Sequence, residues 1–73
     1  MFKVHYMKGE KAGTVKTYRT AGTAGRPVHR YIWPILGMGM SHKIADWMTK
    51  AEQEGKQKRL IVGETIQVEY NPT

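Results

Sequence analysis

The stretch Ser41–Gly55, SHKIADWMTKAEQEG, decides the fold because it is the one segment with a clear helical pattern. Apolar side chains recur along it every three or four residues, which places them on one face of a helix. They are Ile44, Trp47, Met48 and Ala51. Ser41 is expected to be the N-cap, and Gly55 is expected to end the helix in the left-handed conformation. Trp47 is predicted to anchor this helix in the core.

The chain ahead of this helix begins with two predicted strands. In Phe2–Tyr6 every second residue is apolar, a pattern typical of a strand with one buried face. Residues 9–13, GEKAG, are expected to form a hairpin loop. The returning strand is predicted over Thr14–Thr20, which is rich in Thr, Val and Tyr. Neither face of it is clearly apolar, so we expect an edge strand with a solvated face.

Residues 20–40 carry the weakest structural signal. Thr20–Pro27, TAGTAGRP, is predicted to be a mobile loop because its small residues leave little to pack. Val28–Trp33 is either a third strand or unassigned chain, and Pro34 would end such a strand because proline cannot donate to a ladder. Ile35–Met40 is apolar and contains two glycines, so we expect a flexible lead into the helix.

After the helix, Leu60–Val62 and Thr65–Tyr70 flank Gly63-Glu64, which predicts a hairpin with a two-residue turn. The fold class is therefore α+β, with one helix packed on a small mostly antiparallel sheet in the order ββ(β)αββ. We expect a single small domain over residues 1–73, with a mobile loop at 20–27 and a frayed C-terminus at 71–73. The predicted core is Phe2, Val4, Tyr6, Ile44, Trp47, Met48, Leu60, Val62, Ile66 and Val68.

The composition argues against several function classes. The 73 residues include no cysteine, and the three histidines show no ligand spacing, so we expect no disulfide, metal or cofactor. Neither a signal peptide nor a membrane span is predicted, because no apolar run is long enough. We therefore expect a soluble intracellular protein. Carboxylates do not pair for acid–base work, and no phosphate-binding glycine motif is present, so catalytic residues are expected to be none and the protein is not predicted to be an enzyme.

The positive charge is confined to one part of the chain. The net charge is +6, and residues 1–30 hold seven Lys and Arg side chains against one acid, Glu10. Such a surface attracts phosphates or an acidic protein. The candidate residues for nucleic-acid or acidic-surface binding are Lys16, Arg19, Arg26 and Arg30. Aromatic residues interleave with these cations and could stack on unpaired bases. The alternative is that these aromatic rings complete the core beside ordinary solvated cations.

Protein binding is the other interpretation. The segment Tyr31–Met40, YIWPILGMGM, combines aromatic, aliphatic and methionine side chains, which are favoured at interfaces. The candidate partner-binding residues are Tyr18, Tyr31, Trp33, Ile35, Leu36 and Met38. The alternative, that this segment completes the core, stays open. Trp33→Ala tests it, because an interface role predicts weaker binding with an intact fold.

The chain as a whole resembles the small phage-encoded regulators of host bacterial RNA polymerase. The similarity rests on its length and on three segments: MFKVHYMKGEKAG at the start, RYIWPILGMGM in the centre, and SHKIADWMTKAEQEGK. The resemblance implies a non-catalytic transcription regulator that binds the large β and β′ subunits of the polymerase. It implies inhibition of σ-dependent initiation, read-through of terminators and a place in the host bacterial cytoplasm. No functional residue is carried over from it.

These observations lead to two function hypotheses. The first is the polymerase-binding regulator, an antitermination protein and transcription inhibitor, expected to be a monomer with no membrane contact. The alternative is a small basic nucleic-acid-binding module, which predicts strongly salt-dependent binding to DNA or RNA without other proteins. The polymerase surface that would be bound, and the balance between inhibition and antitermination, stay open.

Overall fold

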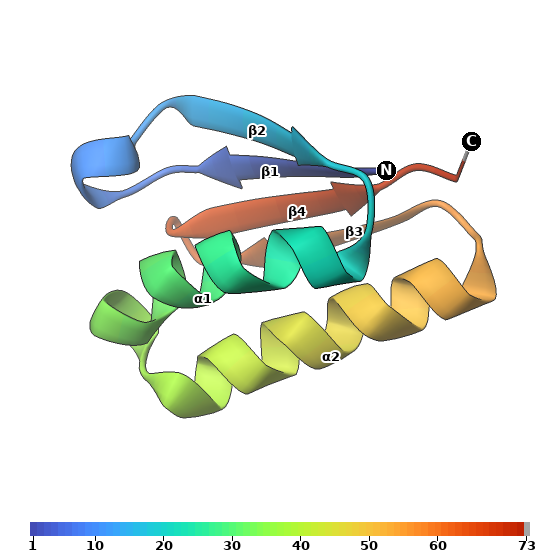
Figure 1. Cartoon of the computed structure of the whole chain (residues 1–73). Coiled ribbons are helices and arrows are strands. Elements are labelled where there is room, and N and C mark those ends of the chain that lie inside the picture. The colour runs from blue at the N-terminus through green and yellow to red at the C-terminus, as the bar shows by residue number, and fades with distance from the viewer. Residues whose placement is uncertain (73) are drawn as a thin grey trace.

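The computed structural model describes residues 1–72 of the chain. Its elements are, in order, strand β1 (Phe2–Tyr6), the short 3-10 helix η1 (Gly9–Lys11), strand β2 (Thr14–Tyr18), helix α1 (Ala21–Leu36), helix α2 (Met38–Glu54), strand β3 (Lys58–Val62) and strand β4 (Ile66–Tyr70). The strands form one layer and the two helices form a second layer on one side of it (Figure 1). Within residues 1–72, neither helix has the length and apolar character needed to cross a membrane.

The sheet is built from two hairpins joined along their first and last strands. Its order is β2-β1-β4-β3, and every neighbouring pair is antiparallel. Val4 on β1 faces Val68 on β4 in the central pair. Met1 and Asn71 continue this pairing, because each backbone donates a hydrogen bond to the other's carbonyl, at 2.7 and 2.9 Å. Asn71 is therefore held at the sheet rather than frayed, and Thr73 lies outside the described residues.

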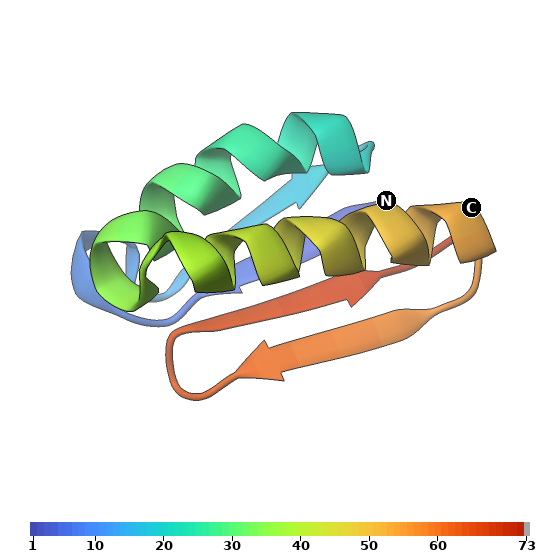
Figure 2. The ribbon, with the colours of Figure 1, turned by 90° about the horizontal axis from the view of Figure 1, so that it is seen from below.

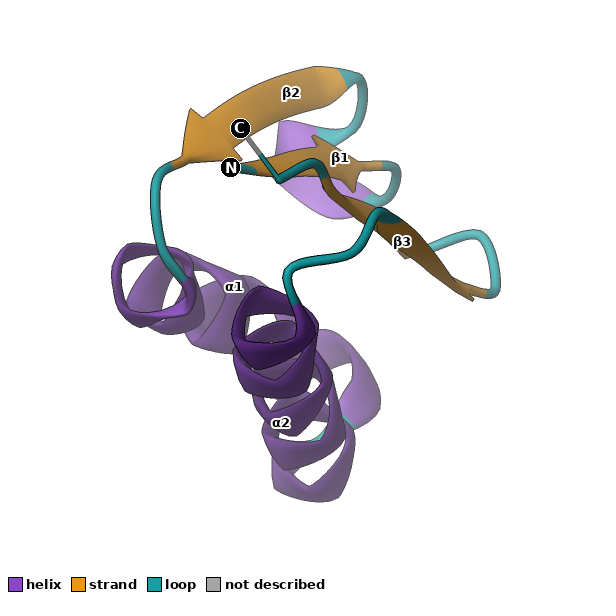
Figure 3. Cartoon of the chain, turned by 90° about the vertical axis from the view of Figure 1, so that its right-hand side faces the viewer, coloured by secondary structure: helices purple, strands orange, loops and turns teal. Residues whose placement is uncertain are grey.

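One face of the sheet carries the core, and the other face is uncovered by any described element. The end-on view shows both helices on the same side of the strands (Figure 3). Seen from below, α1 and α2 lie side by side and β3 extends past α2 (Figure 2). The register places Arg59 and Ile61 of β3 on the uncovered face, because their neighbours Leu60 and Val62 face the helices. Ile61 is 58% exposed there.

Most of the predicted core is confirmed. Seven of its members are buried, namely Phe2, Val4, Tyr6, Ile44, Met48, Ile66 and Val68. Three more are only partly buried against these residues, namely Trp47, Leu60 and Val62. The prediction missed a second group of core residues, namely Ala24, Val28, Tyr31, Ile32, Ala51 and Tyr70. Most of that missed group belongs to α1, a helix that the pattern of the sequence did not predict.

The α+β class, the antiparallel sheet and both hairpins are confirmed, but the element order is ββααββ. The mobile loop predicted at residues 20–27 is wrong, because α1 begins at Ala21. A strand at Val28–Trp33 is also wrong, since these residues are the middle of α1. Finally, Ile35–Met40 is not a flexible lead but the end of α1 and the start of α2. One feature of composition caused these three errors.

Glycine and proline in α1 hide its helical pattern. Four of its 16 residues are glycine or proline, including Pro27 and Pro34 inside the helix. An interior proline costs roughly 3 kcal/mol because it removes a backbone hydrogen bond and crowds the preceding turn. Burial offsets this cost, because the helix still presents an apolar face with a spacing of three and four residues. That face is Ala24, Val28, Tyr31 and Ile32, each at most 7% exposed.

Helix α2 forms where the sequence predicted a helix but starts one turn earlier. Its N-cap is Gly37, with φ of 91°, so the prediction of Ser41 as N-cap is wrong. A positive φ is easy only for glycine, which explains how the chain turns between two helices with a single residue. Gly55 ends α2 in the left-handed conformation, with φ of 66°, as predicted. Asp46 and Lys50, one turn apart on α2, form a surface ion pair at 3.5 Å.

Candidate interaction surface

Exposed apolar side chains gather where α1 turns into α2. Trp33, Ile35, Leu36 and Met38 are 53, 37, 39 and 47% exposed. They lie in the six-residue stretch 33–38, which includes Gly37, at the left-hand end of the helical layer in Figure 1. We call these four residues the elbow patch. The sequence left open whether Tyr31–Met40 is core or interface, and the structure shows that some of its side chains are buried and others exposed.

Tyr31 belongs to the core side of that division. It is 7% exposed, and its ring packs edge-on against Tyr6 with 4.7 Å between centroids. The Tyr31 hydroxyl accepts a hydrogen bond from the Lys8 backbone N–H at 2.9 Å. The Lys8 and Thr65 carbonyl oxygens lie 2.7 and 2.9 Å from it as acceptors for its proton. This hydroxyl ties α1 to both hairpin loops, so we assign Tyr31 to the fold rather than to partner binding.

Tyr18, another predicted partner-binding residue, is half-buried on β2. Its hydroxyl lies 2.9 Å from the Tyr6 hydroxyl. Burial and then this hydrogen bond raise the pKa of Tyr6 above its usual value. The Lys11 ammonium lies over the Tyr6 ring, 5.2 Å from its centroid. Tyr18 therefore lies at the edge of the core, and its hydroxyl is engaged in a hydrogen bond with Tyr6.

The four predicted cationic residues are all exposed. Lys16 lies on β2, Arg19 follows that strand, and Arg26 and Arg30 lie one turn apart on α1. Among residues 1–72, the ion pairs are Lys50–Asp46, Lys58–Glu54 and Arg59–Glu69, so none involves these four. Lys58 also holds the pKa of the Glu54 carboxyl below its usual value, through a hydrogen bond. These four cations are thus outside the ion pairs of residues 1–72, whereas Lys50, Lys58 and Arg59 of the second half are engaged in them.

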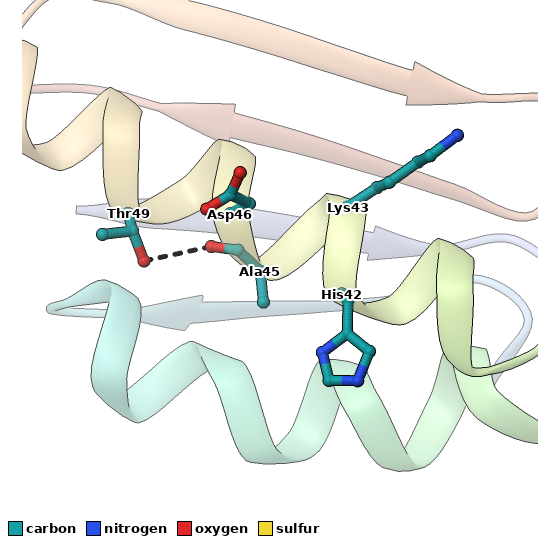
Figure 4. Close-up of a pocket in the computed structure, with 5 residues that line it drawn as sticks. All are labelled: His42, Lys43, Ala45, Asp46 and Thr49. Carbon is teal, nitrogen blue, oxygen red and sulfur yellow. Dashed lines mark hydrogen bonds between the residues drawn. The ribbon is translucent and has the colours of Figure 1, made fainter.

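A cluster of rings lies at the surface where α1 and α2 meet. The His29 and Trp33 rings stack with 5.5 Å between centroids and an angle of 26°. His42 reaches the same place from α2, with 6.4 Å between its centroid and that of His29. In the close-up, His42 is directed toward α1, whereas Asp46 and Lys43 are directed away from it (Figure 4).

Ser41 of α2 contacts this cluster through His29. Its Oγ lies 2.5 Å from His29 Nδ1, a geometry that resembles a nucleophile beside its base. Ser41 is only 2% exposed, so a substrate has no access to the hydroxyl. We therefore interpret the pair as a hydrogen bond that joins α1 to α2. Within residues 1–72, His, Cys, Asp and Glu side chains form no cluster of three that could hold a metal ion.

The sequence indicated most residues of this surface as candidates, but it did not indicate that they lie together. Trp33, Arg26 and Arg30 were all candidates, but as parts of a loop or a strand they had no common face. The signal that could have grouped them is the spacing of three and four residues between Arg26, Arg30 and Trp33, which is helical. His42 could be placed beside His29 only by the packing of α1 against α2. No protein-family model, characterised protein or solved structure matches this chain.

Proposed function

We propose that this protein is a non-catalytic transcription regulator that binds bacterial RNA polymerase through the elbow patch. The observation that carries a binding role is the exposure of four large apolar side chains within six residues. Contiguous apolar surface on a soluble domain is typical of a protein-binding site. Tryptophan is a preferred anchor of such sites, and methionine adapts its shape to a partner.

The shape of the elbow supports docking with little rearrangement. Ile32, next to Trp33, is fully buried, and so is Ile44, one helical turn and a half beyond Met38. The patch thus lies on two helices that are held by buried core residues, and not on a mobile loop. A surface that is already ordered loses less conformational entropy on binding than a flexible segment does.

The identity of the partner rests on the resemblance to phage regulators of RNA polymerase. It suggests the β and β′ subunits as targets, with inhibition of σ-dependent initiation and read-through of terminators as outcomes. The unpaired cations at the other side of α1 suit such a partner, because a transcribing polymerase presents nucleic acid and acidic surfaces together. The action would take place in the cytoplasm of the host bacterium.

The test is a pull-down from nuclease-treated bacterial lysate with the immobilised protein, followed by binding to purified RNA polymerase. We expect the β and β′ subunits to be retained by the natural chain. The double variant Leu36→Ser/Met38→Ser should lose most of this binding, because it makes the elbow patch polar.

The matched control is Val15→Ser/Ile61→Ser, which removes two apolar side chains that are 46 and 58% exposed on the uncovered face of the sheet. This control should bind the polymerase as the natural chain does. Loss of binding in the control but not in the elbow variant would move the docking site to the sheet. A natural chain that does not bind purified polymerase would refute the proposal.

A further inference from the structure

The outer side of α1 presents cations and an aromatic ring on one face, which shares only Trp33 with the elbow patch. Arg26, Arg30 and Trp33 are exposed, and their spacing of four and three residues places them in one row along the helix. His29 lies behind the row, stacked on Trp33. We call Arg26, Arg30, Trp33 and His29 the outer face of α1.

Trp33 is held in place and yet accessible, which is what a stacking platform requires. More than half of it, 53%, is exposed, although its ring is already supported by the His29 ring. His29 is itself fixed through the hydrogen bond to the buried Ser41. A ring that is ordered before binding can stack on a base without a large entropy loss.

The charged side chains of α1 beside this ring, Arg26 and Arg30, are both positive. Glu10 lines a pocket together with Arg30, but no ion pair joins these two residues. Arg26 and Arg30 take part in none of the ion pairs among residues 1–72. The neighbouring acid on α2, Asp46, is paired with Lys50 and directed away from α1 (Figure 4). Glu52, the other acid of α2 near this helix, accepts a hydrogen bond from the Ala21 backbone N–H at the start of α1. The face therefore favours an anionic ligand that also carries flat rings.

Single-stranded nucleic acid has both of these features. One turn of helix separates Arg26 from Arg30 by about 6 Å along the axis, which suits neighbouring phosphates of an extended strand. Unpaired bases expose their ring faces, whereas in a duplex these faces are covered by stacking and only edges are accessible. We propose that the outer face of α1 binds single-stranded RNA or DNA, with a base stacked on Trp33 and phosphates paired with Arg26 and Arg30.

This activity goes beyond the proposed docking on polymerase and needs no other protein. The probe is a labelled oligouridylate, compared with oligothymidylate, of roughly 4–16 nucleotides, the range that small single-strand-binding domains cover. Binding to the purified full chain is followed by fluorescence anisotropy over a series of salt concentrations. We expect saturable binding that weakens steeply as salt rises.

Matched variants separate this face from general positive charge. Arg26→Gln/Arg30→Gln should lower the slope of log affinity against log salt by about 1.4, from roughly 0.7 per phosphate contact. Lys3→Gln/Lys56→Gln removes the same charge from two exposed lysines elsewhere and should leave the slope nearly unchanged. Trp33→Ala should weaken binding about tenfold, while Trp33→Phe, which keeps a flat ring, should retain most of the affinity.

Three results would overturn the proposal: no saturable binding at low salt, equal losses in the two charge-removal pairs, or equal affinity for a duplex of the same length. The elbow variant Leu36→Ser/Met38→Ser should bind the oligonucleotide normally. Because the oligonucleotide assay contains no polymerase, a negative result in it does not bear on the proposed binding to polymerase.

Discussion

The two helices of this protein are almost equal in length but are stabilised in different ways. Helix α2 has the local signals of a helix: an apolar stripe, an i,i+4 ion pair and a glycine C-cap. In helix α1, four of the 16 residues are glycine or proline, and two of these are interior prolines. It forms because other parts of the chain supply what its own sequence lacks.

A local capping box and contacts with distant parts of the chain both support α1. At the start, Thr20 and Thr23 each accept a hydrogen bond from the other's backbone N–H, both at 3.2 Å. The Glu52 carboxylate accepts from Ala21 N–H at 3.0 Å. Toward the end, the Tyr31 hydroxyl binds the backbone of both hairpin loops. The comparison teaches that a helix stabilised by distant contacts can carry an unusual composition, and here that composition forms the candidate surface.

The largest expected effect comes from Ile32→Ala. Ile32 is fully buried, and removing its side chain should lower the free energy of unfolding by about 2–5 kcal/mol. That is a large part of the roughly 4–11 kcal/mol typical of a chain of this size. Urea denaturation measures it.

The adjacent residue is the control for this prediction. Trp33→Ala should cost about 1 kcal/mol, because Trp33 is 53% exposed and loses mainly its stacking contact with His29. A cost for Trp33→Ala as large as that for Ile32→Ala would assign Trp33 to the core and remove it from both proposed surfaces.

Next in size is Tyr31→Phe. This change removes only the hydroxyl that joins α1 to Lys8 and Thr65, and it should cost about 1–3 kcal/mol because buried backbone groups lose a partner. Tyr70→Phe is the matched control, since the Tyr70 hydroxyl takes part in no hydrogen bond within residues 1–72. Equal thermal midpoints for the two variants would mean that the contact does not support α1.

The same substitution, threonine to alanine, should destabilise the protein at the start of α1 but not within α2. Thr20→Ala removes the cap of α1 and should cost about 1 kcal/mol. Thr49→Ala on α2 removes a hydroxyl that donates to the Ala45 carbonyl one turn earlier. This second change should be neutral or slightly stabilising, because alanine is the better helix former and threonine bonds of this kind weaken a helix. Chemical denaturation of both variants compares them directly, and a clear loss for Thr49→Ala would contradict the distinction.

The smallest expected effect is at the surface of α2. Lys50→Gln breaks the exposed pair with Asp46 and should cost less than about 0.5 kcal/mol at low salt, and nothing measurable at high salt. Melting curves at two ionic strengths check this. A loss that persists at high salt would show that Lys50 has another role.

For the candidate surface, the sequence predicted the residue types but not their arrangement. The exposure of Trp33 and the burial of Tyr31, two positions apart, follow from which way each side chain points on α1. That direction is defined only once the segment is known to be helical and packed on the sheet. His29, Ser41 and His42 meet across two helices, and no spacing in the chain indicates that contact.

The sequence by itself determined the two hairpins, most of the strand core, helix α2 and the uneven charge, because local periodicity and turn chemistry specify these features. The tertiary structure alone decided that residues 21–36 are a helix. Their local preferences oppose it, and only burial against β1, β2 and α2 together with the distant hydrogen bonds offsets the cost of proline and glycine. The elbow patch and the outer face of α1 depend on that same helix, since all their residues except Met38 lie on it.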